Sequence, residues 1–151
     1  MGKKKPPKIH FVCEGNTFRS RLAEAYLKSL KTKGEVSSSG VDAKRNLNGP
    51  ITPWANEVAK KEGIYRYLAK MWTQSTKRII DPQDLVIFLE KKYFDFCNNR
   101  LRCELQEYEI WDIPDITLVQ KEITDARTKR ALNIFQDIKS NVDSLKDKYQ
   151  L

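Results

Sequence analysis

Residues 9–30, IHFVCEGNTFRSRLAEAYLKSL, join an apolar strand to a helix through an unusual turn. The apolar run that ends at Cys13 predicts a buried first strand. The helical spacing of apolar residues after the turn predicts a helix over residues 20–33, with Gly34 at its end. A strand followed directly by a helix is the unit from which α/β domains are built.

The turn has the composition of an anion-binding loop. The backbone N–H groups of residues 14–20 can point inward around an anion, and the N-terminus of the helix adds partial positive charge. Gly15 permits a strained turn, and Asn16 tolerates the left-handed conformation that a closed loop requires. Arg19 can hold two oxygens of the anion with its planar guanidinium.

Cys13 is the candidate nucleophile at the start of this loop. A thiol among inward N–H groups and beside a guanidinium loses its proton easily. A thiolate surrounded by phosphate-binding donors indicates covalent phosphoryl transfer. The competing interpretation is a buried structural cysteine followed by a surface arginine.

The rest of the chain alternates predicted strands and helices. The predicted strands are residues 35–39, 85–89 and 108–111, and the predicted helices are residues 53–61 and 125–149, with residues 41–50 as a loop. This order predicts a single doubly wound parallel sheet with helices on both faces. Ligands bind beyond the carboxyl ends of the strands in such sheets, and Cys13 lies at one of these ends.

Composition limits the class of protein and its partners. The 151 residues are enough for one domain, and the net charge of +8 favours anionic partners such as nucleic acid, acidic membrane or phosphorylated substrates. Aromatic and basic residues do not alternate as in single-strand binders, so nucleic acid is not the expected partner. No run is apolar enough to span a membrane or direct secretion, so we expect a cytoplasmic protein with a basic flexible tail over residues 1–7 and a domain over 8–151.

The segment CEGNTFRS, followed by RLAEAYL, resembles the CX5R(S/T) loop and first helix of the low molecular weight protein tyrosine phosphatase family. Weaker similarities occur at VSSSG (residues 36–40), DLVIFLE (84–90) and WDIPD (111–115). The family shares its fold with thioredoxin-coupled arsenate reductases. The resemblance implies a four-stranded parallel sheet flanked by helices, and catalysis without a metal or another cofactor.

The resemblance also implies roles for the loop residues. Cys13 would be the nucleophile and Arg19 the clamp for the phosphate and the transition state. The hydroxyl of Ser20 would stabilise the thiolate, and Asn16 with Ser38 would brace the loop. The residues expected to bind the substrate phosphate are Glu14, Gly15, Asn16, Thr17, Phe18 and Ser20.

Asp115 is the candidate general acid, because relatives that act on aryl phosphates carry an aspartate in a late loop. It would protonate the leaving phenolate and then deprotonate the water that attacks the phosphocysteine. Apolar surface from Trp111, Ile113 and Pro114 would favour its protonated form. Asp112 is the rival within the motif, and a solvated loop aspartate is the alternative to both.

The chain departs from the family pattern around the pocket. The family's Asp-Pro is Asp115-Ile116 here, and Thr117-Leu118 replaces an aromatic pair. The aromatic residues that could supply the missing wall, or belong to the core or rim, are Phe18, Trp54 and Trp111. Arg21 replaces a proline, which would add positive charge beside the pocket and favour acidic substrates.

Two further departures concern histidine and cysteine. The family histidine that supports the loop asparagine is absent from the region of residues 70–74, and the only histidine of this chain is His10. We expect His10 to be a packed strand residue without a second metal ligand. Phe18 fills the place of a second loop cysteine, so the protective disulfide of mammalian-type members cannot form.

Two other functions remain possible on the sequence alone. In arsenate reductases, oxidation passes from the loop cysteine to two others, but the first relay position is Glu90 here, with Cys97 near the second and Cys103 beyond it. A relay from Cys13 would require closely placed sulfurs, and we expect bystander thiols instead. The other alternative is a non-catalytic module that binds phosphate or polyanions with strong salt dependence.

The sequence thus predicts a cysteine-dependent phosphatase of aryl phosphate monoesters that works through a phosphocysteine at Cys13. The expected substrate is protein phosphotyrosine. Phosphoarginine and small phosphate esters, and the oligomeric state, are not distinguished by the sequence.

Overall fold

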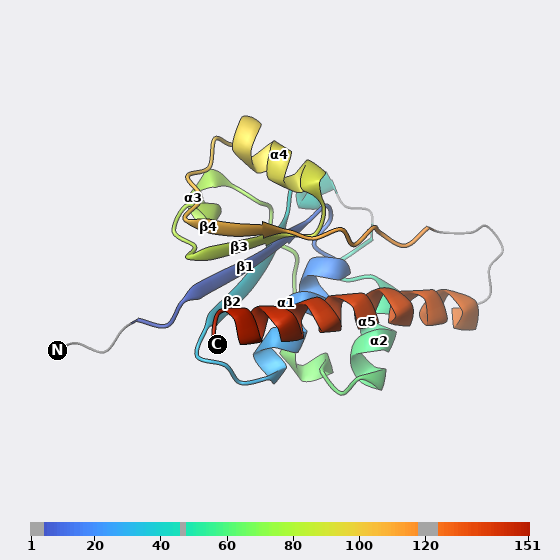
Figure 1. Ribbon diagram of the computed structural model, residues 1–151. Coiled ribbons are helices and arrows are strands. Elements are labelled where there is room, and N and C mark those ends of the chain that lie inside the picture. The colour runs from blue at the N-terminus through green and yellow to red at the C-terminus, as the bar shows by residue number, and fades with distance from the viewer. Residues whose placement is uncertain (1–4, 46–47, 118–123) are drawn as a thin grey trace.

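The computed structural model describes residues 5–45, 48–117 and 124–151, which form one parallel four-stranded sheet with helices packed on it (Figure 1). The strands are β1 (Lys8–Cys13), β2 (Glu35–Gly40), β3 (Leu85–Phe88) and β4 (Glu107–Ile110). Their order in the sheet is β2-β1-β3-β4, and every pair is parallel. The predicted fold class is therefore confirmed.

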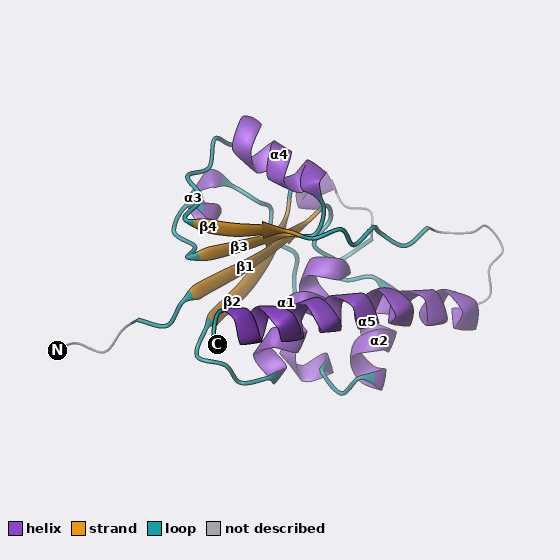
Figure 2. Cartoon of the chain, in the orientation of Figure 1, coloured by secondary structure: helices purple, strands orange, loops and turns teal. Residues whose placement is uncertain are grey.

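The helices cover both faces of the sheet, as the purple ribbons of Figure 2 show. Helices α1 (Arg19–Ser29), α2 (Pro53–Lys61) and α5 (Thr124–Lys148) lie on one face. Helices α3 (Lys77–Ile80) and α4 (Lys91–Asn99) lie on the other. Two short 3₁₀ turns, η1 (Ala43–Arg45) and η2 (Tyr65–Tyr67), interrupt the loops on either side of α2.

Strand β1 lies between β2 and β3, and this position places its carboxyl end at the centre of the sheet edge. Residues 9–13 of β1 and all of β3 are buried, as expected for central strands of a parallel sheet covered on both faces. The chain leaves β1 for β2 on one side and later returns to β3 on the other. Such a reversal of strand order is where open α/β sheets bind ligands.

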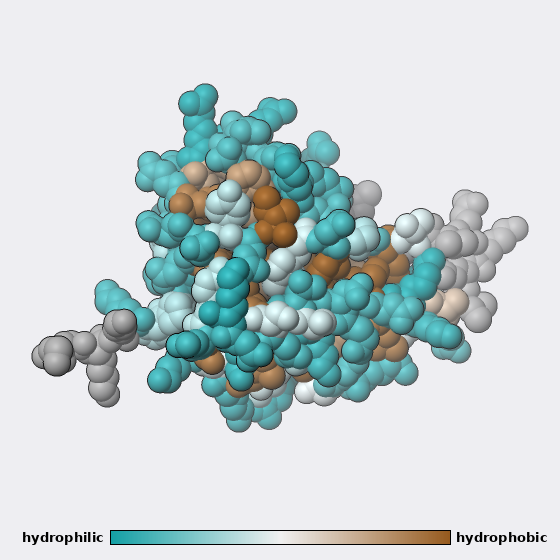
Figure 3. Space-filling model, in the orientation of Figure 1, coloured by the Kyte–Doolittle hydropathy of each residue, from teal (hydrophilic) through white to brown (hydrophobic). Residues whose placement is uncertain are grey.

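Helix α5 closes the face that holds α1 and α2. Its apolar stripe is buried and consists of Ala131, Phe135, Ile138, Val142 and Leu145. The ring of Phe135 meets that of Tyr26 on α1 edge-on, with centroids 5.9 Å apart. The face of the molecule in Figure 3 is mostly hydrophilic with smaller hydrophobic patches, and no helix within the described residues has the length and apolarity to cross a membrane.

The end of α1 differs from the prediction. The helix ends at Ser29 instead of Lys33, because Leu30 turns its N–H to the carbonyl of Leu27 and Lys31 enters the left-handed region with φ 52°. Gly34 therefore does not cap the helix. It lies close to β1 instead, since a Cβ there would lie 2.8 Å from the Cδ1 atom of Ile9.

Candidate active site

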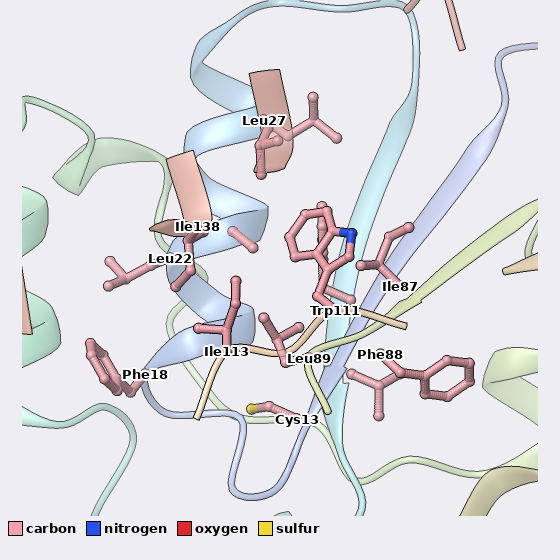
Figure 4. Close-up of a cluster of buried hydrophobic side chains, with 14 of the residues drawn as sticks. Cys13, Phe18, Leu22, Leu27, Ile87, Phe88, Leu89, Trp111, Ile113 and Ile138 are labelled. Atoms are coloured by element: carbon pink, nitrogen blue, oxygen red, sulfur yellow. The ribbon is translucent and has the colours of Figure 1, made fainter. Parts of the chain in front are cut away.

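Cys13 ends β1 and is 3% exposed at the mouth of the predicted loop. Its Sγ atom lies 2.9 Å from Oγ of Ser20 and accepts a hydrogen bond from the N–H of Asn16 at 3.3 Å. Figure 4 shows the sulfur below the apolar side chains of Leu89 and Ile113, which close the core above it. The thiol is therefore held at the boundary between the core and the loop.

Asn16 braces the loop from inside. It has the left-handed conformation expected from the sequence, with φ 55°, and its Nδ2 donates to Oγ of Ser20 at 2.7 Å and to Oγ of Ser38 at 2.8 Å. Because Ser20 accepts from Asn16, its own proton is free to point at the sulfur of Cys13. The structure thus brings together all three residues that the resemblance assigned to loop support.

Two partners of this network were not predicted from the sequence. The backbone N–H of Thr73 donates to Oδ1 of Asn16 at 2.8 Å, so a main-chain group acts where the family has a histidine. Ser38 in turn donates to the buried carboxylate of Glu24 at 2.5 Å. Glu24 follows Ser20 by four residues on α1, a spacing that places both on the same helix face.

Arg19 is 2% exposed, and protein atoms hold three of its N–H groups. Nη1 donates to Oε1 of Glu90 at 2.6 Å and to the carbonyl of Ile113 at 2.8 Å, and Nη2 donates to the hydroxyl of Tyr93 at 2.7 Å. Burial opposes the charged form, but electrostatic interactions with Cys13 and Asp115 and the hydrogen bond to Tyr93 raise the pKa of Arg19. A guanidinium has five N–H donors, so these three hydrogen bonds leave two donors that can bind oxygens of a phosphate.

Glu90 and Tyr93 are functional residues that sequence reasoning missed in this role. Glu90 immediately precedes α4, and Tyr93 lies in the first turn of that helix. Burial raises the pKa of Tyr93, which keeps the phenol protonated, and its hydroxyl lies 3.3 Å from Oε1 of Glu90. The centre of the Tyr93 ring also lies 5.4 Å from the Cζ atom of the Arg19 guanidinium. Both residues fix the plane of the guanidinium.

Asp115 lies beside this arginine. One of its carboxylate oxygens is 3.6 Å from Nη2 of Arg19, whereas the other accepts from the N–H of Ile116 at 2.8 Å. The predicted apolar enclosure is wrong, because the carboxylate is 50% exposed while Ile113 is buried in the core. Asp112 is exposed and makes no contact with Arg19 among the described residues.

The remaining loop residues are fixed from outside. Glu14 is exposed and Gly15 half-buried, whereas Thr17 and Phe18 are buried. Both the N–H and the hydroxyl of Thr52 donate to the carbonyl of Thr17 at 3.1 Å. The left-handed residue of the loop is Asn16 and not Gly15.

The candidates for an aromatic wall belong to the core instead. Phe18, Trp54 and Trp111 are at most 9% exposed, and all three belong to the main hydrophobic cluster. Thr117 is exposed, and Leu118 lies outside the described residues. Within the described part of the chain, the wall that family members build from an aromatic pair has no aromatic replacement from these three residues.

Comparison with known proteins gives the site its context. Residues 8–143 match the family model described as low molecular weight phosphotyrosine protein phosphatase. The chain belongs to this family. The phosphatase class predicted from the CX5R(S/T) loop is thereby confirmed.

Relatives within the phosphatase family bear two kinds of name. A Klebsiella pneumoniae protein named low molecular weight protein-tyrosine-phosphatase is 30% identical over 71% of this chain and 77% of its own length. A protein-arginine-phosphatase of Bacillus subtilis is 35% identical over 56% of this chain and 57% of its own length. Family membership thus leaves the phosphorylated residue open.

Solved structures agree with the fold. An arginine phosphatase of Geobacillus stearothermophilus superposes with a TM-score of 0.77 and 26% identity, covering 96% of this chain and 94% of its own. A thioredoxin-dependent arsenate reductase of Corynebacterium glutamicum has a TM-score of 0.68 and 20% identity, covering 96% of this chain and 62% of its own. The latter likeness shows the shared fold alone.

Arg21, which replaces a family proline, does not have the position expected from the sequence. It is 1% exposed, and its guanidinium donates to the carbonyls of Asn16 at 3.1 Å, Pro50 at 2.8 Å and Ala69. Burial lowers the pKa of Arg21. The positive charge expected beside the pocket is therefore enclosed by backbone carbonyls instead of open to a substrate, and this arginine ties the phosphatase loop to two neighbouring segments.

The other cysteines lie away from the contacts of Cys13. Cys97 and Cys103 are free and buried, and Cys103 donates its N–H to the carbonyl of Cys97 at 3.0 Å. Burial raises the pKa of Cys97 to about 12, so this thiol is a poor nucleophile. Glu90, at the first relay position of arsenate reductases, instead holds Arg19. These contacts favour the phosphatase over the reductase.

His10 is a packed strand residue. It is 1% exposed, and each ring nitrogen lies 2.7 Å from a serine hydroxyl, Ser37 on one side and Ser39 on the other. Burial lowers the pKa of His10 to about 3, so the ring is neutral at physiological pH. No group of three or more potential metal ligands occurs within the described ranges.

Proposed function

We propose that the protein hydrolyses phosphate monoesters through a phosphocysteine at Cys13. The observation that carries this proposal is one buried sulfur that contacts the Ser20 hydroxyl and the Asn16 N–H and interacts electrostatically with the Arg19 guanidinium. The thiolate would attack phosphorus while Arg19 binds two nonbridging oxygens, so that the P–O bond to the leaving group breaks as the P–S bond forms. Positioning and electrostatic stabilisation supply most of the catalysis in such transfers.

Asp115 is proposed as the acid and then the base. Its carboxyl group would give its proton to the leaving oxygen and would then take a proton from the water that attacks the phosphocysteine. The carboxylate is exposed enough to reach the substrate, and its position 3.6 Å from Arg19 keeps it beside the phosphate. The rival Asp112 lies outside the contacts of Arg19, and the other carboxylate at this arginine, Glu90, is already held by Arg19 and Tyr93.

The proposed substrate class is phosphorylated protein, and aryl phosphate, as in phosphotyrosine, is the first candidate because of the family to which the chain belongs. Phosphoarginine is the second candidate, because a protein-arginine-phosphatase is 35% identical over 89 residues. We also propose that the protein acts in the cytoplasm, where thiols such as Cys13 stay reduced.

Leaving groups of different basicity test the role of Asp115. We expect Asp115→Ala to lower kcat by about 10²- to 10⁴-fold with phenyl phosphate, whose leaving group needs a proton. The loss should be smaller with p-nitrophenyl phosphate, because p-nitrophenolate leaves without protonation. Asp112→Ala is the matched control and should retain activity with both compounds. An equal loss for both compounds in Asp115→Ala would contradict the assignment.

Phosphopeptides then separate the two substrate candidates. One peptide sequence carrying either phosphotyrosine or phosphoarginine is offered to the wild type, with chelator present, and released phosphate is measured. A higher kcat/KM for phosphotyrosine is the result expected from the aryl phosphate proposal. A higher kcat/KM for the phosphoarginine peptide would contradict this proposal and would support phosphoarginine as the substrate.

A further inference from the structure

A cavity of about 360 Å³ lies beside the phosphate loop, between α2, the loop that precedes it and the segment around η2. Its walls combine apolar, polar and cationic side chains. The lining residues that matter here are Asn56, Tyr65, Arg66, Leu68 and Lys70, together with the backbone of Pro50 and Ala69. The reaction proposed at Cys13 does not use this cavity, although Leu68 in its wall also packs against the core.

The charged side chains that line the cavity are all positive. Arg66 and Lys70 are exposed, and no described residue that lines the cavity carries a carboxylate. The Arg66 guanidinium lies 4.9 Å from the centre of the Tyr67 ring, which holds it by a cation–π contact. Lys60 adds a third cation nearby, with its Nζ 5.2 Å from the centre of the Tyr65 ring. A carboxylate is the complementary group.

Arg21 links this cavity to the active site. A single Nη1 atom donates both to Asn16 in the phosphate loop, at 3.1 Å, and to Pro50 in the cavity wall, at 2.8 Å. Nη2 donates to the carbonyl of Ala69, which also lines the cavity. Because one buried guanidinium contacts all three segments, the cavity and the loop are fixed at short distance from each other.

We propose that this cavity binds an acidic side chain of the substrate polypeptide, close in sequence to the phosphorylated residue. The inference rests on the proposed function. An extended chain advances about 3.3 to 3.6 Å per residue, so a substrate bound at Cys13 needs only a few residues to reach the cavity. Arg66 and Lys70 would bind the carboxylate, and Arg21 is a positioning residue that keeps their segment beside the loop.

Peptide kinetics test the cavity directly. Phosphopeptides are compared that carry glutamates before the phosphorylated residue, after it, on both sides or on neither. The double variant with Arg66→Ala and Lys70→Ala should raise KM for the preferred acidic peptide by about three- to tenfold, as expected for two exposed ion pairs. It should leave KM for the neutral peptide within twofold of the wild-type value. Hydrolysis of p-nitrophenyl phosphate, which is too small to reach the cavity, normalises each variant for the phosphate loop itself.

The matched control removes the same charge elsewhere. Lys33 and Arg78 are exposed, and both precede strands, so they lie at the sheet edge away from Cys13. A double variant with Lys33→Ala and Arg78→Ala should keep the wild-type preference for the acidic peptide. If general electrostatic attraction caused the preference, both double variants would show the same rise in KM for the acidic peptide.

Other outcomes overturn the inference. If the wild type shows no preference for acidic peptides, or if the cavity variant loses activity equally on all substrates, the cavity does not bind a substrate carboxylate. Failure of the wild type to hydrolyse p-nitrophenyl phosphate would contradict the proposed function instead. Binding of the same peptides to Cys13→Ser, followed by fluorescence anisotropy with and without the Arg66 and Lys70 substitutions, tests the cavity in that case as well.

Discussion

Arg19 lies close to Cys13 in the sequence, but its hydrogen-bond partners are distant in the sequence. Its place six residues after Cys13 predicts contact with a phosphate, because strand, loop and helix bring both residues to one anion site. Its partners Glu90 and Tyr93 could not be predicted, since they reach it only after β3 returns beside β1. The sequence therefore indicates which residues act, and the fold determines how the guanidinium is oriented.

A lysine in place of Arg19 tests that orientation. We expect Arg19→Lys to lower kcat by about 10²- to 10³-fold, nearly as much as Arg19→Ala, because an ammonium cannot hold two oxygens in one plane while it also contacts Glu90 and Tyr93. Steady-state hydrolysis of p-nitrophenyl phosphate measures the effect. The control is Lys91→Ala, which removes an exposed cation at the start of α4 whose ion pair is with Asp95. Nearly full activity in Arg19→Lys would count against the clamp.

At the scale of elements, the phosphate loop depends on the end of β2 as much as on β1 and α1. The N–H groups of Val41 and Asp42 donate to the carbonyls of Cys13 and Glu14 at 3.0 and 2.9 Å. Gly40 lies against the loop so closely that a Cβ would be 2.4 Å from the carbonyl oxygen of Glu14 and 2.7 Å from the nitrogen of Asn16. The loop therefore has little room to change shape.

Gly40→Ala should displace the loop without unfolding the sheet. The added methyl would force the backbone of residues 14–16 to move, and a displacement of about 1 Å at a catalytic group can cost about 10²-fold in rate. We expect a loss of kcat of that order with p-nitrophenyl phosphate.

Gly63→Ala is the matched control for this substitution. It has φ 73° but no atom within 4 Å of an added Cβ, so it should lower stability without lowering the kcat of folded protein. Unfolding curves for both variants separate the two effects. Unchanged kcat in Gly40→Ala would show that the loop tolerates the displacement.

The sequence predicted some helices with their correct bounds and did not predict others. The prediction for α2 matches its bounds of Pro53–Lys61, because Thr52 caps the helix and Pro53 begins it. Helices α3 and α4 were not predicted: α3 has only four residues, and α4 begins directly after β3 without a side-chain cap. Short helices of this kind depend on tertiary packing more than on local pattern.

At the scale of the whole molecule, the alternation of strands and helices was sufficient to predict a doubly wound sheet with parallel strands, but not the order of those strands. The division into a tail over residues 1–7 and a domain over 8–151 stays a prediction. Burial of His10 was expected from its place in the first strand, whereas burial of Arg21 could not be predicted, because an arginine at the start of a helix looks like a surface residue in the sequence. Both prove to be enclosed by segments far away in the chain.

His10 makes the stability of the whole fold depend on pH. Its ring has a pKa of about 3 in the folded protein and about 6.5 in the unfolded chain, so between these values only the unfolded state binds the proton. The stabilisation is complete above pH 6.5 and is lost as the pH falls, by about 1.4 kcal/mol per pH unit from this residue.

Urea denaturation between pH 7 and pH 4 measures this slope. Protonation of carboxylates contributes to the slope in every variant, so the comparison with His10→Gln isolates the histidine. We expect the free energy of unfolding of the variant to fall less steeply than that of the wild type below pH 6.5. Identical slopes would show that His10 is not held neutral.

The central claim is that phosphate passes through the sulfur of Cys13. The most direct test is rapid acid quench of the wild-type protein during turnover of p-nitrophenyl phosphate with chelator present, followed by mass spectrometry of the peptide that contains Cys13. We predict a phosphorylated Cys13 that forms with a burst of p-nitrophenolate, and neither signal nor turnover in Cys13→Ser. Sustained turnover in Cys13→Ser would contradict the account.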